Sequence, residues 1–474
     1  MTPDIVNKYE AMLKAGESVY LDPIEIDQIF RYYADNNQVS KLEDILRLGL
    51  NLHPDDPTIM QLDAEYTLMT NDAESALKKI DAIFQEDNTF LCILRSAALA
   101  MLGRKTEAME MADLALTDEN PNEYVAYDIA LGFMNAGDFT TAMHFYERSL
   151  RNHPDDIRTL SGMLYCHEQM GHLEETMPIA EKILASDPFH YDAWMAKGNY
   201  LSAHEQFTEA LDAYDYAAAI APDEPDYLVM KARCYEETNQ HDLAVQSLKE
   251  AADKAEGKQR SSIAQILANI HIDHKETDAA VEALWLSVQA QPRDNAVLQN
   301  AGITFMQLGY NVEAITMLEA ANEVQPDDTE TLIPLADAYS NCQLFEKAAA
   351  TYEKLSILAP SAAVYSLWGG TMMSLGKVQK AYNLFKKANE CEELWQTYVL
   401  MAVCDAELKH FKKMEEDFRY AYALCPDEAP TLMKSIHPDM YNQMSEQGFF
   451  DQLERERQAY ILLQENICRK KGNK

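Results

Sequence analysis

The chain contains little glycine and proline for its length. Among 474 residues, 16 are glycine and 17 are proline. An all-β sandwich or barrel of this length would need many more turn residues. Hydrophobic residues make up 47% of the chain and charged residues 25%, a balance that is ordinary for a folded protein and unlike that of a disordered one. We therefore expect a folded chain built mainly from helices.

The sequence also lacks the patterns of membrane and secreted proteins. Its most apolar stretch, 90–102, is interrupted by Arg95 and is shorter than the roughly 20 residues that a membrane helix needs. The first residues, MTPDIVNKYEAML, have no basic start followed by an apolar core, so no secretory signal is predicted. The eight cysteines form no CxxC pair, which favours reduced, buried thiols over disulfides or zinc ligands. We expect a cytoplasmic protein with no membrane insertion.

Basic residues are scarce. Lys and Arg total 40 against 78 Asp and Glu, which gives a formal net charge of −38. This charge repels the phosphates of nucleic acids and anionic lipids, so we expect no nucleic-acid partner. It either keeps a long exposed chain soluble or attracts a basic partner, and the sequence leaves both possibilities open.

A repeat of fixed length runs through the chain. Prolines recur at intervals of 34 residues, at Pro154, Pro188 and Pro222 and again at Pro292, Pro326 and Pro360. A constant period of this size indicates stacked helix pairs. With small loop insertions and deletions, the period defines twelve units, which begin near residues 23, 57, 89, 123, 157, 191, 225, 261, 295, 329, 362 and 395.

Two columns of the repeat hold small residues. Position 8 is Gly, Ala or Ser in ten of the twelve units, with Phe30 and Leu164 as the exceptions. Position 20 is alanine in nine units, at residues 76, 108, 142, 210, 244, 280, 314, 348 and 381. Small side chains allow two helix backbones to approach closely. These columns therefore predict two helices that cross within each unit. Position 15 is glycine in five units, at residues 103, 137, 171, 309 and 376, where a left-handed turn between the helices is expected.

These columns resemble the tetratricopeptide repeat family, whose pattern is W-x2-L-G-x2-Y followed by A-x3-F-x2-A-x4-P. The unit that begins at Tyr191 carries Trp194, Gly198, Ala210, Tyr214, Ala217 and Pro222 at the matching positions. The resemblance covers about residues 23–426. It implies an all-α, right-handed α-solenoid of about twelve helix-turn-helix repeats. A repeat array needs covered ends, so we expect an N-terminal capping helix in 1–22, and C-terminal capping helices with a short basic tail in 427–474.

Catalytic patterns are weak. The chain has no GxxxxGK[ST] and no GxGxxG phosphate loop. His271 and His274, with Asp273 and Glu276 nearby, have a spacing that suits one helix face, but a zinc site needs a further ligand. We therefore predict no catalytic residue, no cofactor and no metal site. A metal-dependent enzyme remains a distant alternative.

The resemblance implies that a partner protein or peptide binds in the groove lined by the first helix of each pair, mainly at positions 2, 5, 9, 12 and 13. In the units from 89 and 123 these columns are apolar, and they supply the predicted contacts Phe90, Ile93, Tyr124, Tyr127, Leu131 and Met134. Exposed apolar surface often marks an interaction site, although the same side chains could instead be buried by neighbouring helices.

A second candidate set lies further along the chain. Gln265, Asn269 and Asn300 imitate part of the carboxylate clamp found in chaperone-binding members of the family. The third unit of the clamp offers Glu330 and Pro334 where basic residues are needed, so the clamp is broken.

The sequence therefore predicts a non-catalytic protein-interaction scaffold or adaptor. The expected partner is a protein or peptide that carries a basic or amphipathic segment. A short-peptide sensor or a chaperone-like assembly factor is the alternative.

Overall fold

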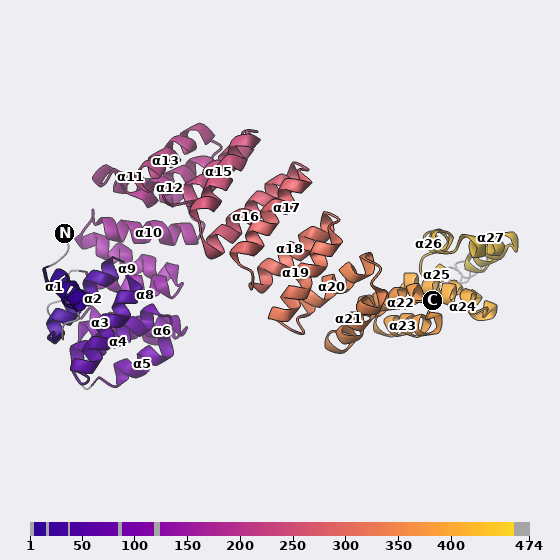
Figure 1. Cartoon of the computed structure of the whole chain (residues 1–474), viewed down its shortest axis with the longest axis horizontal. Coiled ribbons are helices and arrows are strands. Elements are labelled where there is room, and N and C mark those ends of the chain that lie inside the picture. The colour runs from indigo at the N-terminus through magenta and orange to yellow at the C-terminus, as the bar shows by residue number, and fades with distance from the viewer. Residues whose placement is uncertain (1–3, 16–18, 37, 84–87, 118–123, 459–474) are drawn as a thin grey trace, which may run out of the picture. The chain divides into compact units, whose positions relative to one another are not determined.

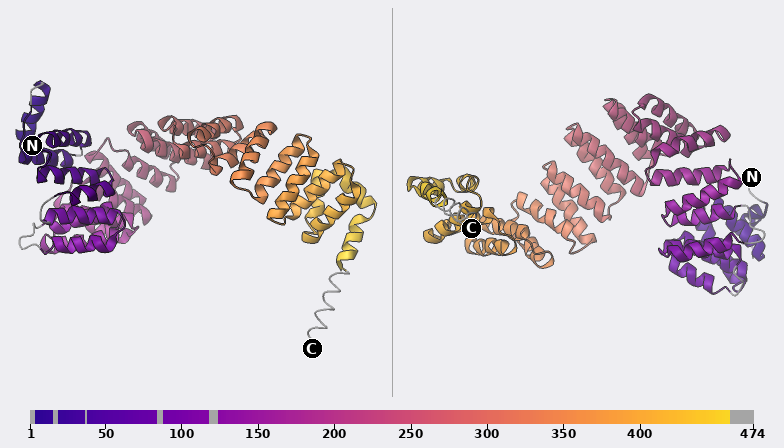
Figure 2. Two further views of the ribbon diagram at one scale, coloured as in Figure 1. Left: turned by 90° about the horizontal axis from the view of Figure 1, so that it is seen from below. Right: turned by 180° about the vertical axis from the view of Figure 1, so that it is seen from behind.

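The computed structural model describes residues 4–15, 19–36, 38–83, 88–117 and 124–458. Within these residues the ordered elements are helices, and no strand occurs. The chain divides into two compact units, Met1–Ser247 and Leu248–Lys474, and the boundary falls inside α15 (His241–Lys254). Figure 1 shows the succession of helices, and the two views of Figure 2 show the paired helices of each unit from other sides.

The first unit begins with a single helix and continues as helix pairs. Its helices are α1 (Asp4–Ala15), α2 (Pro23–Asp35), α3 (Val39–Leu52), α4 (Pro57–Met69), α5 (Ala73–Asp81), α6 (Thr89–Met101), α7 (Lys105–Ala115), α8 (Val125–Asn135), α9 (Phe139–Asn152), α10 (Ile157–Gln169), α11 (Leu173–Ser186), α12 (Tyr191–Ala203), α13 (Phe207–Ile220) and α14 (Asp226–Glu237).

The second unit has the same organisation. Its helices are α16 (Gly257–Asp273), α17 (Thr277–Ala290), α18 (Asn295–Gln307), α19 (Asn311–Val324), α20 (Thr329–Asn341), α21 (Phe345–Leu358), α22 (Ala362–Ser374), α23 (Val378–Cys391), α24 (Trp395–Glu407), α25 (Phe411–Leu424), α26 (Ala429–Ile436) and α27 (Pro438–Glu446), followed by helical residues 449–458.

The predicted unit starts match the first helix of each pair. Nine of these helices begin at the predicted residue, and α8 and α14 begin within two residues of it. The exception is α16, which begins at Gly257, four residues before the predicted 261. Only residues 255 and 256 separate α15 from α16, so the connecting loop is short. The residues that were expected to belong to this loop form the first turn of α16 instead.

Alanine at position 20 packs as predicted. All nine of these alanines are fully buried, as are Leu42 and Thr176 in the same column. Glycine at position 8 is required by the neighbouring helix: a Cβ atom at Gly198 would lie 2.4 Å from the ring of Tyr214, and one at Gly369 would lie 2.5 Å from the ring of Phe385. Positions 8 and 24 of one repeat therefore form the crossing between its two helices.

The turn at position 15 is left-handed throughout the described repeats. The five glycines have φ between 70° and 86°, as predicted. Side chains other than glycine adopt the same conformation in the other units whose position 15 the structure describes, although it is unfavourable for them. These residues, with φ between 58° and 66°, are Asn71, Glu205, Asn239, Lys275, Gln343 and Lys409.

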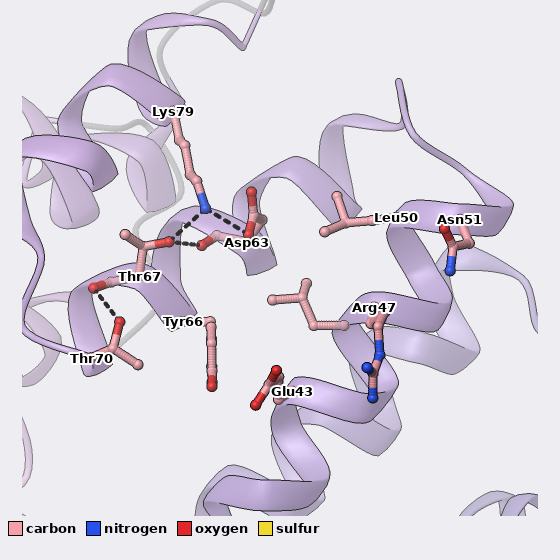
Figure 3. Close-up of a pocket in the computed structure, with 10 residues that line it drawn as sticks. Glu43, Arg47, Leu50, Asn51, Asp63, Tyr66, Thr67, Thr70 and Lys79 are labelled. Carbon is pink, nitrogen blue, oxygen red and sulfur yellow. Dashed lines mark hydrogen bonds and ion pairs between the residues drawn. The ribbon is translucent and has the colours of Figure 1, made fainter.

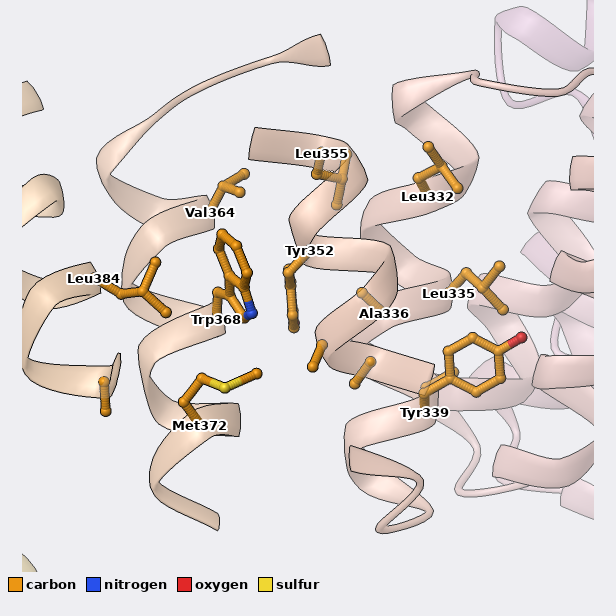
Figure 4. Close-up of a cluster of buried hydrophobic side chains, with 14 of the residues drawn as sticks. Leu332, Leu335, Ala336, Tyr339, Tyr352, Leu355, Val364, Trp368, Met372 and Leu384 are labelled. Atoms are coloured by element: carbon orange, nitrogen blue, oxygen red, sulfur yellow. The ribbon is translucent and has the colours of Figure 1, made fainter. Parts of the chain in front are cut away.

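Large aromatic side chains fill the space between pairs. In the second unit, Trp368 on α22 lies beside Tyr352 on α21 and is surrounded by Val364, Met372 and Leu384 (Figure 4). The Tyr352 hydroxyl is satisfied within this apolar core, because it donates a hydrogen bond to Asp337 Oδ1 at 2.5 Å. Each pair thus buries its apolar face against the next pair.

Helices also cover the two ends. Val6 and Tyr9 of α1 are buried against the first pairs, and Met433, Phe449 and Leu453 are buried at the other end. Sequence reasoning also placed Tyr460, Leu463, Ile467 and a basic tail of Arg469, Lys470, Lys471 and Lys474 at the C-terminus. These residues lie outside the part of the chain that the structure describes.

Candidate partner-binding surface

In the first unit, the first helices of successive pairs form one continuous surface. Neighbouring members of the series α2, α4, α6, α8 and α10 contact one another, and we call their shared surface the first-helix face. The six residues predicted to bind a partner in this unit lie on α6 and at the start and along the length of α8, and all of them are half-buried. We call this set the α6/α8 patch: Phe90, Ile93, Tyr124, Tyr127, Leu131 and Met134.

Two arginines lie over the aromatic rings of the α6/α8 patch. The Arg158 guanidinium is 4.4 Å from the ring centroid of Tyr124 and 5.4 Å from that of Tyr127. The Arg31 guanidinium is 5.3 Å from the Phe90 ring. Cations at these distances are attracted by the faces of aromatic rings. The patch is therefore a mixture of apolar and cationic groups, where the sequence had suggested an apolar surface.

Half of the patch lines an open pocket of about 370 Å³ between α8 and α10. Tyr127, Leu131 and Met134 form one wall. The opposite side carries Tyr165, which is 46% exposed, and Ser161. Its remaining lining residues are Tyr146, Ile157, Arg158, Gly162 and His190. The pocket has mainly apolar walls and a polar rim, the combination found in sites that accept one apolar side chain.

The polar rim is partly fixed by internal hydrogen bonds. Ser161 Oγ donates to the carbonyl oxygen of Ile157 at 2.8 Å and lies 3.0 Å from His190 Nε2. Arg158 is held less firmly: its Nε is 3.5 Å from Asp156 Oδ1 and its side chain is 55% exposed. Arg158 can therefore move away from the tyrosine rings at small cost, since exposed ion pairs contribute little.

A second arginine is tied into a tighter network. Arg31 donates to Asp27 Oδ1 at 3.2 Å and to Glu65 Oε1 at 2.6 Å. The other carboxylate oxygen of Glu65, Oε2, is buried and has no hydrogen-bond partner among the described residues. Burial raises the pKa of Glu65, although Arg31 opposes this effect. The network leaves negative charge that its own arginine does not fully neutralise.

Asp128 on α8 adds a further carboxylate to this face. It is half-buried and accepts no side-chain or backbone hydrogen bond within the described ranges. Burial raises its pKa to about 6; the charges of Arg158 and Arg31 lower it and that of Glu65 raises it. Asp128 therefore lies within the electrostatic field of both arginines but is bonded to neither of them.

In the second unit, the structure brings the three predicted amides together. Gln265, Asn269 and Asn300 line one small pocket of about 200 Å³ between α16 and α18. Gln265 Nε2 donates to Ser287 Oγ at 3.2 Å, while Asn269 and Asn300 are exposed. The residues that break the clamp lie on α20, where Glu330 is exposed and Pro334 sits inside the helix.

Comparison with known proteins finds similarity to tetratricopeptide repeat proteins. A family model described as tetratricopeptide repeat matches residues 167–225 and 195–259. Hsp70-Hsp90 organizing protein 3 of Arabidopsis thaliana is 27% identical over 127 residues, which are 26% of this chain and 23% of that protein. BBSome complex member BBS4 of Bos taurus is 22% identical over 222 residues, which are 47% of this chain and 36% of that protein. The matches thus span about a quarter to a third of these relatives.

Among solved structures, the C-terminal part of a TPR repeat-containing protein from Cytophaga hutchinsonii is 18% identical, with 51% of this chain and 99% of that chain covered and a TM-score of 0.40. The repeats that the family model matches, within residues 167–259, have the spacing and buried columns described above. Residues 167–259 contain tetratricopeptide repeats. The fold of the chain is the all-α solenoid of helix pairs that the sequence predicted.

Sequence reasoning missed three charged residues of this surface: Arg31, Glu65 and Asp128. A signal for two of them was available. Arg31 and Glu65 are 34 residues apart, so they occupy position 9 of consecutive repeats, and position 9 is one of the columns that line the groove in the family. Opposite charges in one such column predict an ion pair between neighbouring first helices.

In a different pocket of the first unit, one group of polar side chains is paired internally. This pocket lies between α3, α4 and α5, has a volume of about 390 Å³ and is drawn in Figure 3. Lys79 Nζ donates to Asp63 Oδ1 and to Thr67 Oγ1, both at 2.8 Å. Thr70 Oγ1 donates to the Thr67 carbonyl oxygen at 3.0 Å. This closed network differs from the first-helix face, where Asp128 is left without a donor.

The histidine motif that had suggested a metal site is divided in the structure. His271 is buried on α16, and its Nδ1 lies 2.6 Å from Glu276 Oε2. His274 is exposed at the C-terminal end of the same helix. The seven cysteines that the structure describes form no disulfide with one another, and burial raises the pKa of Cys166 to about 11 and that of Cys404 to about 12. Both are poor nucleophiles, because the thiolate is the reactive form.

Proposed function

We propose that this protein is a scaffold that holds a segment of a partner protein on the first-helix face of its first unit. The observation that carries the proposal is the open pocket lined by Tyr127, Leu131 and Met134. These side chains are adaptable or offer a large contact area, and they are accessible although they belong to helices whose other faces form the core. Proteins of the tetratricopeptide family serve as protein-interaction scaffolds, which supports the proposal.

We propose the cytoplasm as its compartment. The described cysteines form no disulfide with one another, which suits a reducing environment, and no described helix is both long enough and apolar enough to cross a bilayer. Several relatives are named Hsp70-Hsp90 organizing proteins. Capture of a chain terminus at the amide pocket of the second unit is not part of our proposal, because Glu330 and Pro334 replace the basic residues that a carboxylate clamp needs.

Peptide display on phage tests the proposal. Purified full-length protein is panned against random peptides, and the selected peptides are measured by fluorescence anisotropy. The double variant Tyr127→Ala, Leu131→Ser should weaken their binding about 100-fold, since truncating two central contacts costs about 2–4 kcal/mol. Tyr165→Ala is a second variant, chosen because this half-exposed residue at the rim can be truncated without opening the core.

The matched control is the pair Gln265→Ala, Asn300→Ala, which removes two side chains from the pocket of the second unit. It should leave the affinity of the selected peptides within twofold. Circular dichroism and melting curves verify that each variant remains folded. Peptides that bind the Tyr127/Leu131 variant and the Tyr165 variant as tightly as they bind the wild type would show that the pocket is not the binding site.

A further inference from the structure

The first-helix face of the first unit carries more negative than positive charge. Around the α6/α8 patch, Arg31 is shared between Asp27 and Glu65, and Arg158 is loosely paired with Asp156. Asp128 is the carboxylate that remains, and it has no hydrogen-bond donor among the described residues. Two guanidinium groups therefore lie among four carboxylates, and the carboxylates are in excess. A half-buried carboxylate without a protein donor is available to a ligand, which can give it a charge-assisted hydrogen bond.

The position of Asp128 is set by its helix. Residues three and four apart lie on the same side of an α-helix. Asp128 therefore lies on the side of α8 that carries Tyr124 and Leu131, and next to the wall of the pocket that Leu131 and Tyr127 form. A segment whose apolar side chain enters the pocket therefore lies against the side of α8 that carries Asp128.

We infer that the partner segment carries an arginine or lysine next to its apolar anchor, and that this basic side chain binds Asp128 while the anchor occupies the pocket lined by Tyr127, Leu131 and Met134. The inference rests on the proposed function, because it assumes that this pocket holds the segment. Charge complementarity selects the occupant: the local excess of carboxylates and the net charge of −38 both favour a basic segment and repel an acidic one.

Removal of the carboxylate should not unfold the protein. Burial holds the pKa of Asp128 well above its ordinary value, so the charged form is disfavoured in the folded state and the neutral Asp128→Asn variant is expected to melt at the same or a higher temperature. A residue that served only to stabilise the fold would give the opposite result. Loss of binding without loss of stability therefore separates a binding role from a structural one.

The experiment repeats the phage selection on three full-length proteins: wild type, Asp128→Asn, and Asp113→Asn, which removes an exposed charge from the second helix of a neighbouring pair. Peptides selected by the wild type and by the Asp113 variant should contain Arg or Lys at a fixed spacing from an apolar residue. Peptides selected by the Asp128 variant should keep the apolar residue and lose the basic one.

A synthetic peptide from the wild-type selection and its Arg→Gln or Lys→Gln analogue then form a double-mutant cycle. The analogue should bind the wild type about tenfold more weakly, which corresponds to about 1.4 kcal/mol, and should bind Asp128→Asn as well as the parent peptide does. Two outcomes would overturn this inference and leave the proposed function standing. In the first, the selected peptides depend on Tyr127 and Leu131 but contain no basic residue. In the second, replacing the basic residue weakens binding to Asp128→Asn as much as it weakens binding to the wild type. If no selected peptide depends on Tyr127 and Leu131, the proposed function fails and the inference fails with it.

Discussion

The first-helix faces of the two units differ in chemistry although they are built on the same repeat. In the first unit, the face carries aromatic rings, two arginines and the unbonded carboxylate of Asp128. In the second unit, the corresponding pocket between α16 and α18 is lined by amides and hydroxyl groups, and Gln265 already donates to Ser287. The face of the first unit carries a carboxylate without a protein donor, whereas the face of the second unit carries uncharged polar groups, some of which are hydrogen-bonded to each other.

This difference shows which columns of the repeat are constrained. Positions 8, 15, 20 and 24 have the same role in both units, because they set the crossing of two helices and the turn that joins them. The columns of the first-helix face do not set this packing, so their side chains can differ from repeat to repeat while the helix pairs keep the same arrangement. Substitutions in the first class should affect both units alike, and those in the second should affect one.

The largest effect is expected at the crossing of the two helices. Gly198→Ala in the first unit and Gly369→Ala in the second should each lower the free energy of unfolding by about 1–3 kcal/mol, because the added methyl group overlaps the buried ring of Tyr214 or Phe385. Gly370→Ala is the matched control, since a Cβ there meets no atom within 4 Å; it should stabilise α22 by about 0.5–1 kcal/mol.

Urea unfolding of the full chain, followed by hydrogen exchange in peptides from each unit, measures these changes. Equal losses at Gly198 and Gly369 would support a common scaffold. A loss in only one unit would mean that the two helix crossings are not equivalent.

A buried pair of carboxyl groups should make the stability of the second unit depend more strongly on pH than that of the first unit. Asp405 on α24 and Asp417 on α25 are both buried, and burial together with the charge of Asp405 raises the pKa of Asp417 to about 7. Because the folded pKa exceeds the unfolded value of about 3.8, the contribution of Asp417 is fully present below about pH 4 and is lost as pH rises to 7. Asp417→Asn should therefore stabilise the protein by about 2 kcal/mol at pH 8 and have little effect at pH 4.

Chemical denaturation at a series of pH values, with hydrogen exchange of α24 and α25 as the local readout, measures this dependence. Asp451→Asn, at an exposed site in the same unit, is the control and should leave the pH profile unchanged. If Asp417→Asn keeps the wild-type slope between pH 4 and 8, the pKa of Asp417 is not raised in the folded state.

The sequence predicted the scaffold well because its constraints are local and repeated. The 34-residue period located the helix starts, and the alanines of position 20, such as Ala210 and Ala314, are fully buried as expected. The chemistry of the first-helix face was harder to predict, because it depends on residues from separate repeats. Arg31 reaches Phe90 from two repeats away, and no single column shows that contact. The pairing of Arg31 with Glu65 was within reach of the sequence, since the two share a column.

The turn between paired helices gives the smallest expected effect and the closest comparison between units. Glu205 in the first unit and Lys409 in the second adopt φ values of 60° and 61° at position 15, where Gly137 and Gly376 have 78° and 70°. A left-handed backbone costs a residue with a Cβ about 1 kcal/mol relative to glycine, and both side chains are exposed. Glu205→Gly and Lys409→Gly should therefore each stabilise the protein by about 0.5 kcal/mol at most, after the greater flexibility of glycine in the unfolded chain is subtracted. Gly137→Ala is the reverse test and should destabilise by a similar amount. Urea unfolding of the three variants measures these differences, and a loss of stability in both glycine variants would indicate that the side chains of Glu205 and Lys409 stabilise the turn more than the backbone conformation costs.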